Sequence, residues 1–170
     1  MFQLGELVVY GVHGVCRVSQ IQEQVVDRVP RQYLVLEPVS KSGSQYMVPM
    51  HNAVAMNKLT QLLSPEELEE LFQNDAIYES NWIQDENRRK QFYRDQSSTV
   101  NRQTLMQTVH TIYEHRDKMR EQGRKLHVCD EAFLHDAEKV LSGEIAAVLS
   151  LDFQEALQYL RKHLMQPQTV

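Results

Sequence analysis

The fold is decided at the front of the chain by LGELVVYGVHGVCRVSQI, residues 4–21. Residues 4–10 are mostly apolar and rich in β-branched side chains. From Val15 to Ile21 the side chains alternate between two faces, which is the period of a β-strand. Gly11 and Gly14 bracket the segment between these two runs. The pattern therefore predicts two strands joined by a tight turn.

Three more strands are expected before residue 60. A polar break containing a proline, residues 27–30, is typical of a hairpin turn. A buried type of strand follows at 33–36, then a turn rich in serine, glycine and lysine at 40–44. Residues 45–49 and 52–56 read as two further short strands. Five short strands with tight turns in about sixty residues predict a small SH3- or Tudor-like β-barrel.

The chain changes character near residue 60 and becomes helical. Ser64-Pro65-Glu66-Glu67 is a capping box with proline at the first helical position. Asn81 is expected to cap a second helix that runs from Trp82 toward Gln96. Further helices are expected at residues 100–122, with Gly123 as the stop, and from Asp130 and Asp152 onward. The predicted fold class is α+β, with a barrel domain at 1–60 and an all-α helical bundle at 61–170.

The net charge of -5 is distributed unevenly along the 170 residues. Residues 61–81 carry six acidic side chains and no lysine or arginine. Residues 82–125 carry ten basic and six acidic side chains, a net charge of +4. Residues 126–170 carry three basic and seven acidic side chains, a net charge of -4. Any anionic partner should therefore meet the middle of the chain.

The single tryptophan, Trp82, stands just before the most basic stretch, Arg88-Arg89-Lys90 with Arg94. A flat apolar ring beside cations is typical of proteins that bind nucleic-acid backbone and press on a base step. Helical spacing would place Trp82, Arg89 and Tyr93 on a similar side. The alternative is that Trp82 packs in a helical core while the cations form a solvated face. The residues alone leave both readings open.

Catalytic and metal-binding patterns are weak. His13 and Cys16 flank Gly14, but no third group is visible that would orient such a pair for nucleophilic catalysis. His127, Cys129 and His135 could approach one another, yet their spacing does not promise the fourth ligand of a zinc site. No glycine-rich phosphate-binding pattern is present. We expect no enzyme, no cofactor, no metal and no small-molecule substrate.

The location of the protein is also an expectation from sequence. The two cysteines lie far apart and show no CxxC spacing, which favours reduced thiols. Neither a signal segment nor an apolar run near the length of a membrane span is visible. We therefore expect a cytoplasmic protein that does not enter a membrane.

The chain resembles the CarD/CdnL family of bacterial transcription regulators, and its barrel is also similar to the polymerase-interacting module of the transcription-repair coupling factor. The resemblance runs through the chain in order. It is carried by Leu4-Gly5-Glu6-Leu7-Val8-Val9-Tyr10, His13-Gly14-Val15, Tyr33-Leu34-Val35-Leu36, Met47-Val48-Pro49 followed by Asn52, Asn81-Trp82, Leu134 through Leu141, and Gly143-Glu144.

The resemblance implies a function for each domain. The family's barrel binds the β subunit of bacterial RNA polymerase, and its helical domain lies on promoter DNA at the upstream edge of the transcription bubble. The family's tryptophan, matched by Trp82, wedges into the minor groove and helps to hold the open complex, without reading sequence. The expected DNA contacts are Trp82, Arg88, Arg89, Lys90, Arg94, Arg124 and Lys125. The expected polymerase contacts are Gln24, Tyr46, Met47, Val48 and Pro49.

Departures from the family pattern keep a second hypothesis open. Family members often carry cations directly after the tryptophan, where this chain has Asp85 and Glu86. Acidic residues also occupy the later helix, at Asp130, Glu131, Asp136 and Glu138. These would weaken DNA binding or make it depend on the tether to polymerase. The alternative is an adaptor that binds two protein partners and no DNA. The added segment from Asp152 is either a cap on the bundle or a partner surface.

Overall fold

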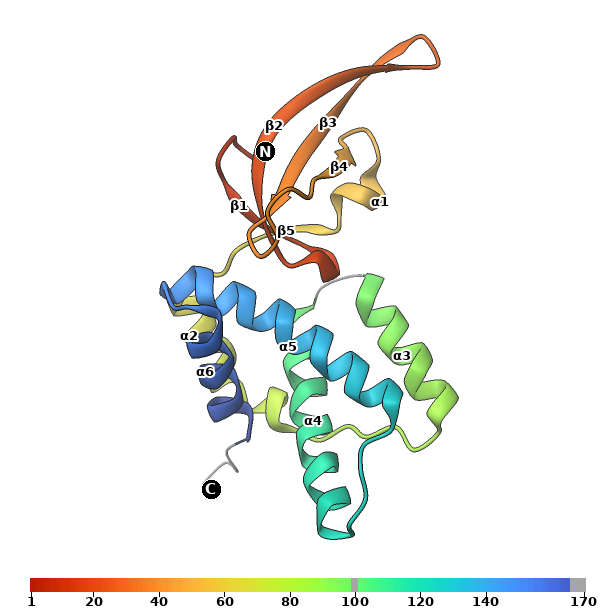
Figure 1. The fold of residues 1–170 in the computed structure, drawn as a ribbon, viewed down its shortest axis with the longest axis vertical. Helices are drawn as coiled ribbons and strands as arrows, with labels where there is room; N and C mark the ends of the chain where they lie inside the picture. Colours follow the sequence, from red (N-terminus) through yellow and green to blue (C-terminus); the bar gives the residue numbers. More distant parts are fainter. Residues whose placement is uncertain (99–100, 166–170) are drawn as a thin grey trace. The chain divides into compact units, whose positions relative to one another are not determined.

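The computed structural model describes residues 1–98 and 101–165, and it divides into two compact units, Met1–Leu62 and Leu63–Val170 (Figure 1). The first unit holds a five-stranded antiparallel sheet and the second holds helices. This arrangement confirms the predicted α+β class, with strands first and helices after them.

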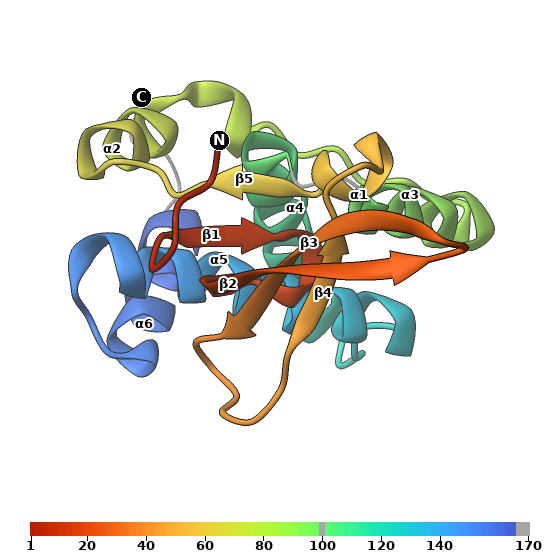
Figure 2. The ribbon, with the colours of Figure 1, turned by 90° about the horizontal axis from the view of Figure 1, so that it is seen from above.

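The sheet of the first unit has the strand order β4-β3-β2-β1-β5. Its strands are β1 Leu7–Tyr10, β2 Val15–Val26, β3 Val29–Pro38, β4 Tyr46–Pro49 and β5 Leu59–Gln61. Figure 2 shows β1 running between β2 and β5. A short 3₁₀ turn, η1 Gly11–His13, connects β1 to β2. The core is built from the apolar side chains of all five strands: Val8, Cys16, Val18, Leu34, Leu36, Val48 and Leu59.

The β2–β3 hairpin is the longest element of the sheet and appears in Figure 1 as an extended ribbon. Its turn consists of Asp27 and Arg28, which both have positive φ, at 52° and 65°. Two left-handed residues form a type I′ turn, whose twist matches that of the flanking strands. The polar break seen in the sequence is therefore a two-residue turn. The register shifts between Val18 and Gln20, where a bulge bends β2.

One predicted strand is wrong. Residues 52–56 form no strand, because Ala53–Met56 is a short helix, α1. The side-chain oxygen of Asn52 accepts the N–H of Ala55 at 3.1 Å and so caps this helix. The fifth strand is instead β5, which comes after α1 and pairs with β1.

In the part of the second unit that the structure describes, there are five helices longer than two turns and one 3₁₀ segment. These are α2 Pro65–Gln73, η2 Asp75–Tyr78, α3 Glu86–Ser98, α4 Arg102–Glu121, α5 Val128–Leu149 and α6 Phe153–Met165. The predicted capping box of α2 is confirmed. Ser64 Oγ accepts the N–H of Glu67 at 3.1 Å, and the Glu67 carboxylate accepts the N–H of Ser64 at 2.7 Å. Residue 100, the predicted start of the third helix, lies outside the described residues.

Two helix starts differ from the prediction. The helix expected from Trp82 begins at Glu86, where the Asp85 carboxylate accepts the N–H of Arg88 at 2.8 Å. Trp82 is therefore not helical, and the expected helical spacing of Trp82 with Arg89 does not apply. The helix expected from Asp130 begins at Val128, with His127 as its N-cap.

The helix that begins after Asp152 completes the hydrophobic core of its unit. Ala156, Leu160 and Leu164 of α6 are fully buried. His110 of α4 lies with Nδ1 2.7 Å from the carbonyl oxygen of Leu164. Of the two readings of this segment, a cap on the bundle is the one that the packing favours.

Ion pairs with buried carboxylates connect the helices. Arg102 of α4 and Glu144 of α5 form a pair at 2.7 Å, and the same carboxylate accepts the N–H of Leu63 at 3.0 Å. Glu138 of α5 pairs with Arg161 of α6 at 2.7 Å. Each pair is held by two hydrogen bonds from its arginine. Among the described residues, no helix is long and apolar enough to cross a membrane.

Candidate nucleic-acid and protein interfaces

Trp82 lies in the extended segment between η2 and α3, and side chains of α4 fix the backbone of this segment. Thr111 Oγ1 accepts the N–H of Asn81 at 3.0 Å. Gln107 donates its side-chain amide to the carbonyl oxygen of Glu79, also at 3.0 Å. The segment that carries the indole is therefore tied to the longest buried stretch of α4.

The face of the Trp82 ring is covered by two side chains. The imidazole of His115, on α4, stacks on it with ring centroids 3.5 Å apart and an interplanar angle of 11°. The guanidinium carbon of Arg89, on α3, lies 4.3 Å from the ring centroid. The ring packs against the helical core and remains only partly buried. Both contacts fix its orientation.

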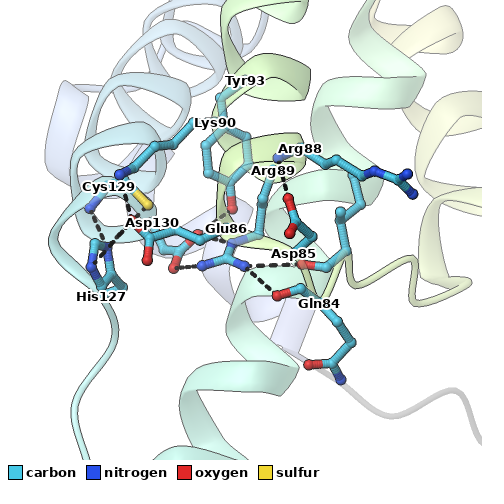
Figure 3. Close-up of polar contacts among 11 residues, drawn as sticks. Gln84, Asp85, Glu86, Arg88, Arg89, Lys90, Tyr93, His127, Cys129 and Asp130 are labelled. Carbon is cyan, nitrogen blue, oxygen red and sulfur yellow. Dashed lines mark hydrogen bonds and ion pairs between the residues drawn. The ribbon is translucent and has the colours of Figure 1, made fainter.

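Arg89 is held by the fold and does not face solvent. It is 6% exposed, and its Nε and Nη2 donate to the two carboxylate oxygens of Asp130 at 2.7 and 3.0 Å (Figure 3). Its Nη1 donates to the carbonyl oxygens of Ile83 and Gln84 at 3.0 and 3.4 Å. A bidentate arginine–carboxylate pair is directional, so it sets the position of the guanidinium. Arg89 therefore links Asp130 to Trp82.

A second donor completes the environment of Asp130. The hydroxyl of Tyr93 donates to Asp130 Oδ1 at 2.6 Å. Burial and the neighbouring Asp130 carboxylate raise the pKa of Tyr93, which keeps its hydroxyl protonated. The Asp130 carboxylate, itself buried, thus receives three hydrogen bonds from side chains of α3.

The other predicted DNA contacts are distributed over two elements. The side chains of Arg88 and Arg94, on α3, are exposed, and Arg94 donates to Gln91 at 2.8 Å. Lys90 is half-buried and forms an ion pair with Glu86. Arg124 and Lys125 are exposed in the loop between α4 and α5. Only Arg89 of the predicted cations is buried.

The structure adds His115 of α4 to the surroundings of Trp82, with the charge of Lys118 acting on that histidine. Burial lowers the pKa of His115, and the neighbouring charges of Arg89, Lys118 and Arg124 lower it further, whereas Asp130 opposes them. No spacing in the sequence connects Trp82 with His115, because the two residues meet only through the packing of their segments. The signal that could have pointed to Lys118 is its place in the basic last turn of α4.

Two of the acidic residues predicted to weaken DNA binding face the interior. Asp130 is paired with Arg89, and Glu138 is paired with Arg161. Glu131 and Asp136 remain exposed on α5. The negative charge that α5 presents to solvent is therefore smaller than its sequence suggests.

The predicted polymerase contacts lie on β4, an edge strand, and on the neighbouring hairpin. Met47 is 42% exposed, and Gln24 of β2 donates to its sulfur at 3.9 Å. Val48 is fully buried in the core of the sheet. Tyr46 is half-buried, with the His13 ring 4.3 Å away. Only part of this predicted set can offer its side chain to a partner.

In the described sheet β4 is an edge strand, paired with β3 on one side of its backbone, and the outward carbonyl oxygen of Pro49 accepts the N–H of Asn52 at 3.1 Å. Met50 donates its N–H to the carbonyl oxygen of Gln32 at 2.9 Å. The backbone N–H and C=O groups of successive residues point to opposite sides in an antiparallel ladder. The backbone groups of Val48 and Tyr46 therefore also point toward β3, and those of Met47 and Pro49 point outward. Pro49 has no N–H, so Met47 supplies the outward N–H of this short edge.

The His13–Cys16 pair lacks the chemistry of a nucleophile. Cys16 is fully buried, and burial raises the pKa of its thiol to about 11. The sulfur lies 3.7 Å from the carbonyl oxygen of Gly14. Because the thiolate is the nucleophilic form, a thiol that stays protonated is unreactive.

Comparison with known proteins identifies a family for residues 2–60. A family model described as the CarD-like/TRCF RID domain matches residues 2–60. No curated protein matches the chain. The match covers the whole sheet except the last residue of β5. The N-terminal unit of the chain, residues 2–60, is a CarD-like/TRCF RID domain.

Proposed function

We propose that the chain is a non-enzymatic transcription regulator that binds the β subunit of bacterial RNA polymerase and holds promoter DNA in its open form. In this proposal residues 1–60 bind polymerase, and residues 61–170 bind DNA. The observation that carries it is the match of residues 2–60 to an RNA polymerase-interacting domain of the CarD type.

The position of β4 at the edge of the described sheet supports a contact with a strand of polymerase. An extended segment can add to an exposed sheet edge through backbone hydrogen bonds, with side chains supplying specificity. Met47 would supply the backbone donor and an exposed apolar side chain, with Gln24 beside it. Val48 would act from the core by keeping β4 in place, and Tyr46 and Pro49 would flank the contact.

The contacts that fix the orientation of the Trp82 ring support a role for it in binding DNA. A minor-groove wedge must resist rotation while it separates a base step, whose unstacking costs on the order of a few kcal/mol. His115 and Arg89 cover the ring face, and part of the ring stays accessible. We assign the wedge to Trp82 and treat Arg89 as the residue that positions it.

The exposed cations would contact phosphates without reading sequence. Arg88, Arg94, Arg124 and Lys125 have exposed side chains in the same unit as Trp82. Lys90 would exchange its partner Glu86 for a phosphate. The pairing of Asp130 and Glu138 inside the unit removes part of the repulsion that favoured the adaptor hypothesis.

The test uses the full chain with purified RNA polymerase and with duplex DNA. We expect stoichiometric binding to a β-subunit fragment, together with a DNA affinity that falls steeply as salt rises. Failure to bind the β subunit contradicts the proposal. Binding to the β subunit without any salt-dependent DNA affinity favours the adaptor instead.

A further inference from the structure

Three chemically distinct donors converge where α3 and α5 begin. They are the carboxylate of Glu86, the imidazole of His127 and the thiol of Cys129, labelled in Figure 3. One ligand atom from each lies within 4.8 Å of the others. His127 Nδ1 is 3.2 Å from Cys129 Sγ, and its Nε2 is 3.6 Å from Glu86 Oε1.

Helix capping explains only part of this arrangement. His127 is the N-cap of α5, and its Nδ1 accepts the N–H of Cys129 at 3.3 Å. That interaction places the imidazole at the helix end. It requires neither a thiol at Cys129 nor a carboxylate from a different helix, and both are present.

We propose that Glu86, His127 and Cys129 form a binding site for Zn²⁺, with the fourth coordination position open to solvent. Thiolate sulfur, imidazole nitrogen and carboxylate oxygen are the donors that zinc prefers, at about 2.0–2.3 Å from the metal. Three protein ligands and one open position also satisfy its tetrahedral geometry.

The side chains can make the adjustment that zinc requires. The side chains of His127 and Glu86 are 50% and 43% exposed, so they can turn without disturbing the core. At present Nδ1 of His127 lies near Cys129 and Nε2 lies near Glu86. A rotation of the imidazole would direct a single nitrogen toward a metal bound between these two residues. Cys129 lies in the first turn of α5, which fixes its position.

Zinc would replace a cation that is already present. Lys90 forms an ion pair with Glu86 in the structure. On binding, the Cys129 thiol loses its proton to solvent and its sulfur coordinates the metal, while the Lys90 ammonium leaves the carboxylate. One proton is thus released for each zinc bound, and Lys90 becomes free to meet another anion.

The proposed zinc site lies next to the residues that support Trp82. Cys129 directly precedes Asp130, the residue that holds Arg89, and Glu86 lies in the first turn of α3. A metal bridging Glu86 and Cys129 would connect α3 to α5 beside the support of Trp82. His135, the ligand considered from the sequence, lies exposed beside Asp136 and is not part of the trio.

The experiment is a Co²⁺ titration of the full, reduced chain, followed by displacement with Zn²⁺. Thiolate coordination gives cobalt an intense charge-transfer absorption in the near ultraviolet, which a site made only of histidines does not give. We expect this band to saturate at one cobalt per chain and to disappear when zinc is added. Cys129→Ser should abolish it, and Glu86→Gln and His127→Asn should weaken zinc binding at least about tenfold.

The variants are chosen to preserve the fold. Asparagine caps helices well, so His127→Asn keeps a cap on α5 while it removes the imidazole. Glu86→Gln tests the site without touching α5, and circular dichroism verifies each variant. His135→Asn is the matched control, an exposed histidine of the same helix, and should bind as the unaltered chain does. Absence of a thiolate band, or a band that survives Cys129→Ser, overturns the proposal.

Discussion

The imidazole of His115 lies parallel to the indole of Trp82, with the ring centroids 3.5 Å apart. The stack connects α4 to a non-helical segment, and Arg89 contacts the same indole from α3. Three separate elements thus determine how the only tryptophan of the chain is oriented. The protonation state of His115 should therefore influence how firmly the Trp82 ring is held.

The first prediction concerns pH. Burial and three neighbouring cations hold the pKa of His115 below its ordinary value of 6.5. The unfolded chain then binds more protons between the two pKa values, so the stability contributed by His115 is complete above about pH 6.5 and is lost as the pH falls through the lower value. His115→Phe should reduce the loss of stability across this window.

Urea denaturation at a series of pH values, followed by Trp82 fluorescence, measures this effect. The ring of phenylalanine keeps the stack and cannot be protonated, so the comparison isolates the charge. His135→Phe, at an exposed position outside the stack, is the control. If the unaltered protein and His115→Phe lost the same stability as the pH falls, His115 would not be the cause of that loss.

The second prediction concerns the pair of Arg89 and Asp130. Asp130→Leu leaves the buried guanidinium without its carboxylate and should lower the free energy of unfolding by about 3–5 kcal/mol. The double variant Arg89→Met with Asp130→Leu should recover much of that stability, because no buried charge remains unpaired. Equilibrium unfolding in urea gives both values. Equal destabilisation in the single and double variants would show that the pair is not the determining interaction.

The third prediction assigns different roles to two adjacent residues of β4, Met47 in binding polymerase and Val48 in stability. Met47→Glu should weaken binding to the β subunit at least about tenfold, since it places a charge on an exposed apolar surface, and should leave stability within about 0.5 kcal/mol. Val48→Ala should instead cost on the order of 2 kcal/mol in stability, because Val48 is fully buried. Thermal unfolding and polymerase binding, measured on both variants, test the division. Unaltered binding by Met47→Glu would remove β4 from the interface.

The fourth prediction concerns salt. Replacing Arg88, Arg94, Arg124 or Lys125 with alanine should reduce the slope of log affinity against log salt by about 1 for each phosphate that the variant no longer neutralises. Lys162→Ala is the control, because Lys162 is exposed on α6, on the far side of α4 and α5 from α3 (Figures 1 and 2). DNA titrations at several salt concentrations give the slopes. A slope that none of the four substitutions alters would place the DNA-binding surface elsewhere.

Local sequence signals predicted the features that depend on neighbouring residues. The capping box at Ser64 and the helix start after Asp152 involve partners only three residues apart, and both are present. Gly123 follows α4 with φ at 68° and ends the helix as expected. The apolar, β-branched composition of residues 4–10 likewise indicated β1, and the alternation from Val15 to Ile21 indicated β2, because a half-buried strand repeats every two residues.

Features that depend on distant partners were not predicted from sequence. Asn81 and Asp85 are both good capping residues, and the chain uses Asp85. The N–H of Asn81 is bonded instead to Thr111, thirty residues away. The sequence places Asp130 among the acids that would weaken DNA binding, and it does not show the pairing with Arg89, which lies 41 residues away. One local feature was also missed: Asn52 caps α1 by accepting the N–H of Ala55, three residues on, where a strand is expected from the sequence.

The lifetime of the promoter open complex, measured with Trp82→Ala and with Trp82→Phe in parallel, tests whether Trp82 acts as a wedge. Polymerase binding should be unchanged, because residue 82 lies outside the RID domain. We predict that the alanine variant shortens the lifetime about tenfold or more, and that phenylalanine, which keeps an apolar ring, recovers part of it. An open complex that persists equally long with Trp82→Ala, in a variant that still binds polymerase, would contradict the role of Trp82 as a wedge.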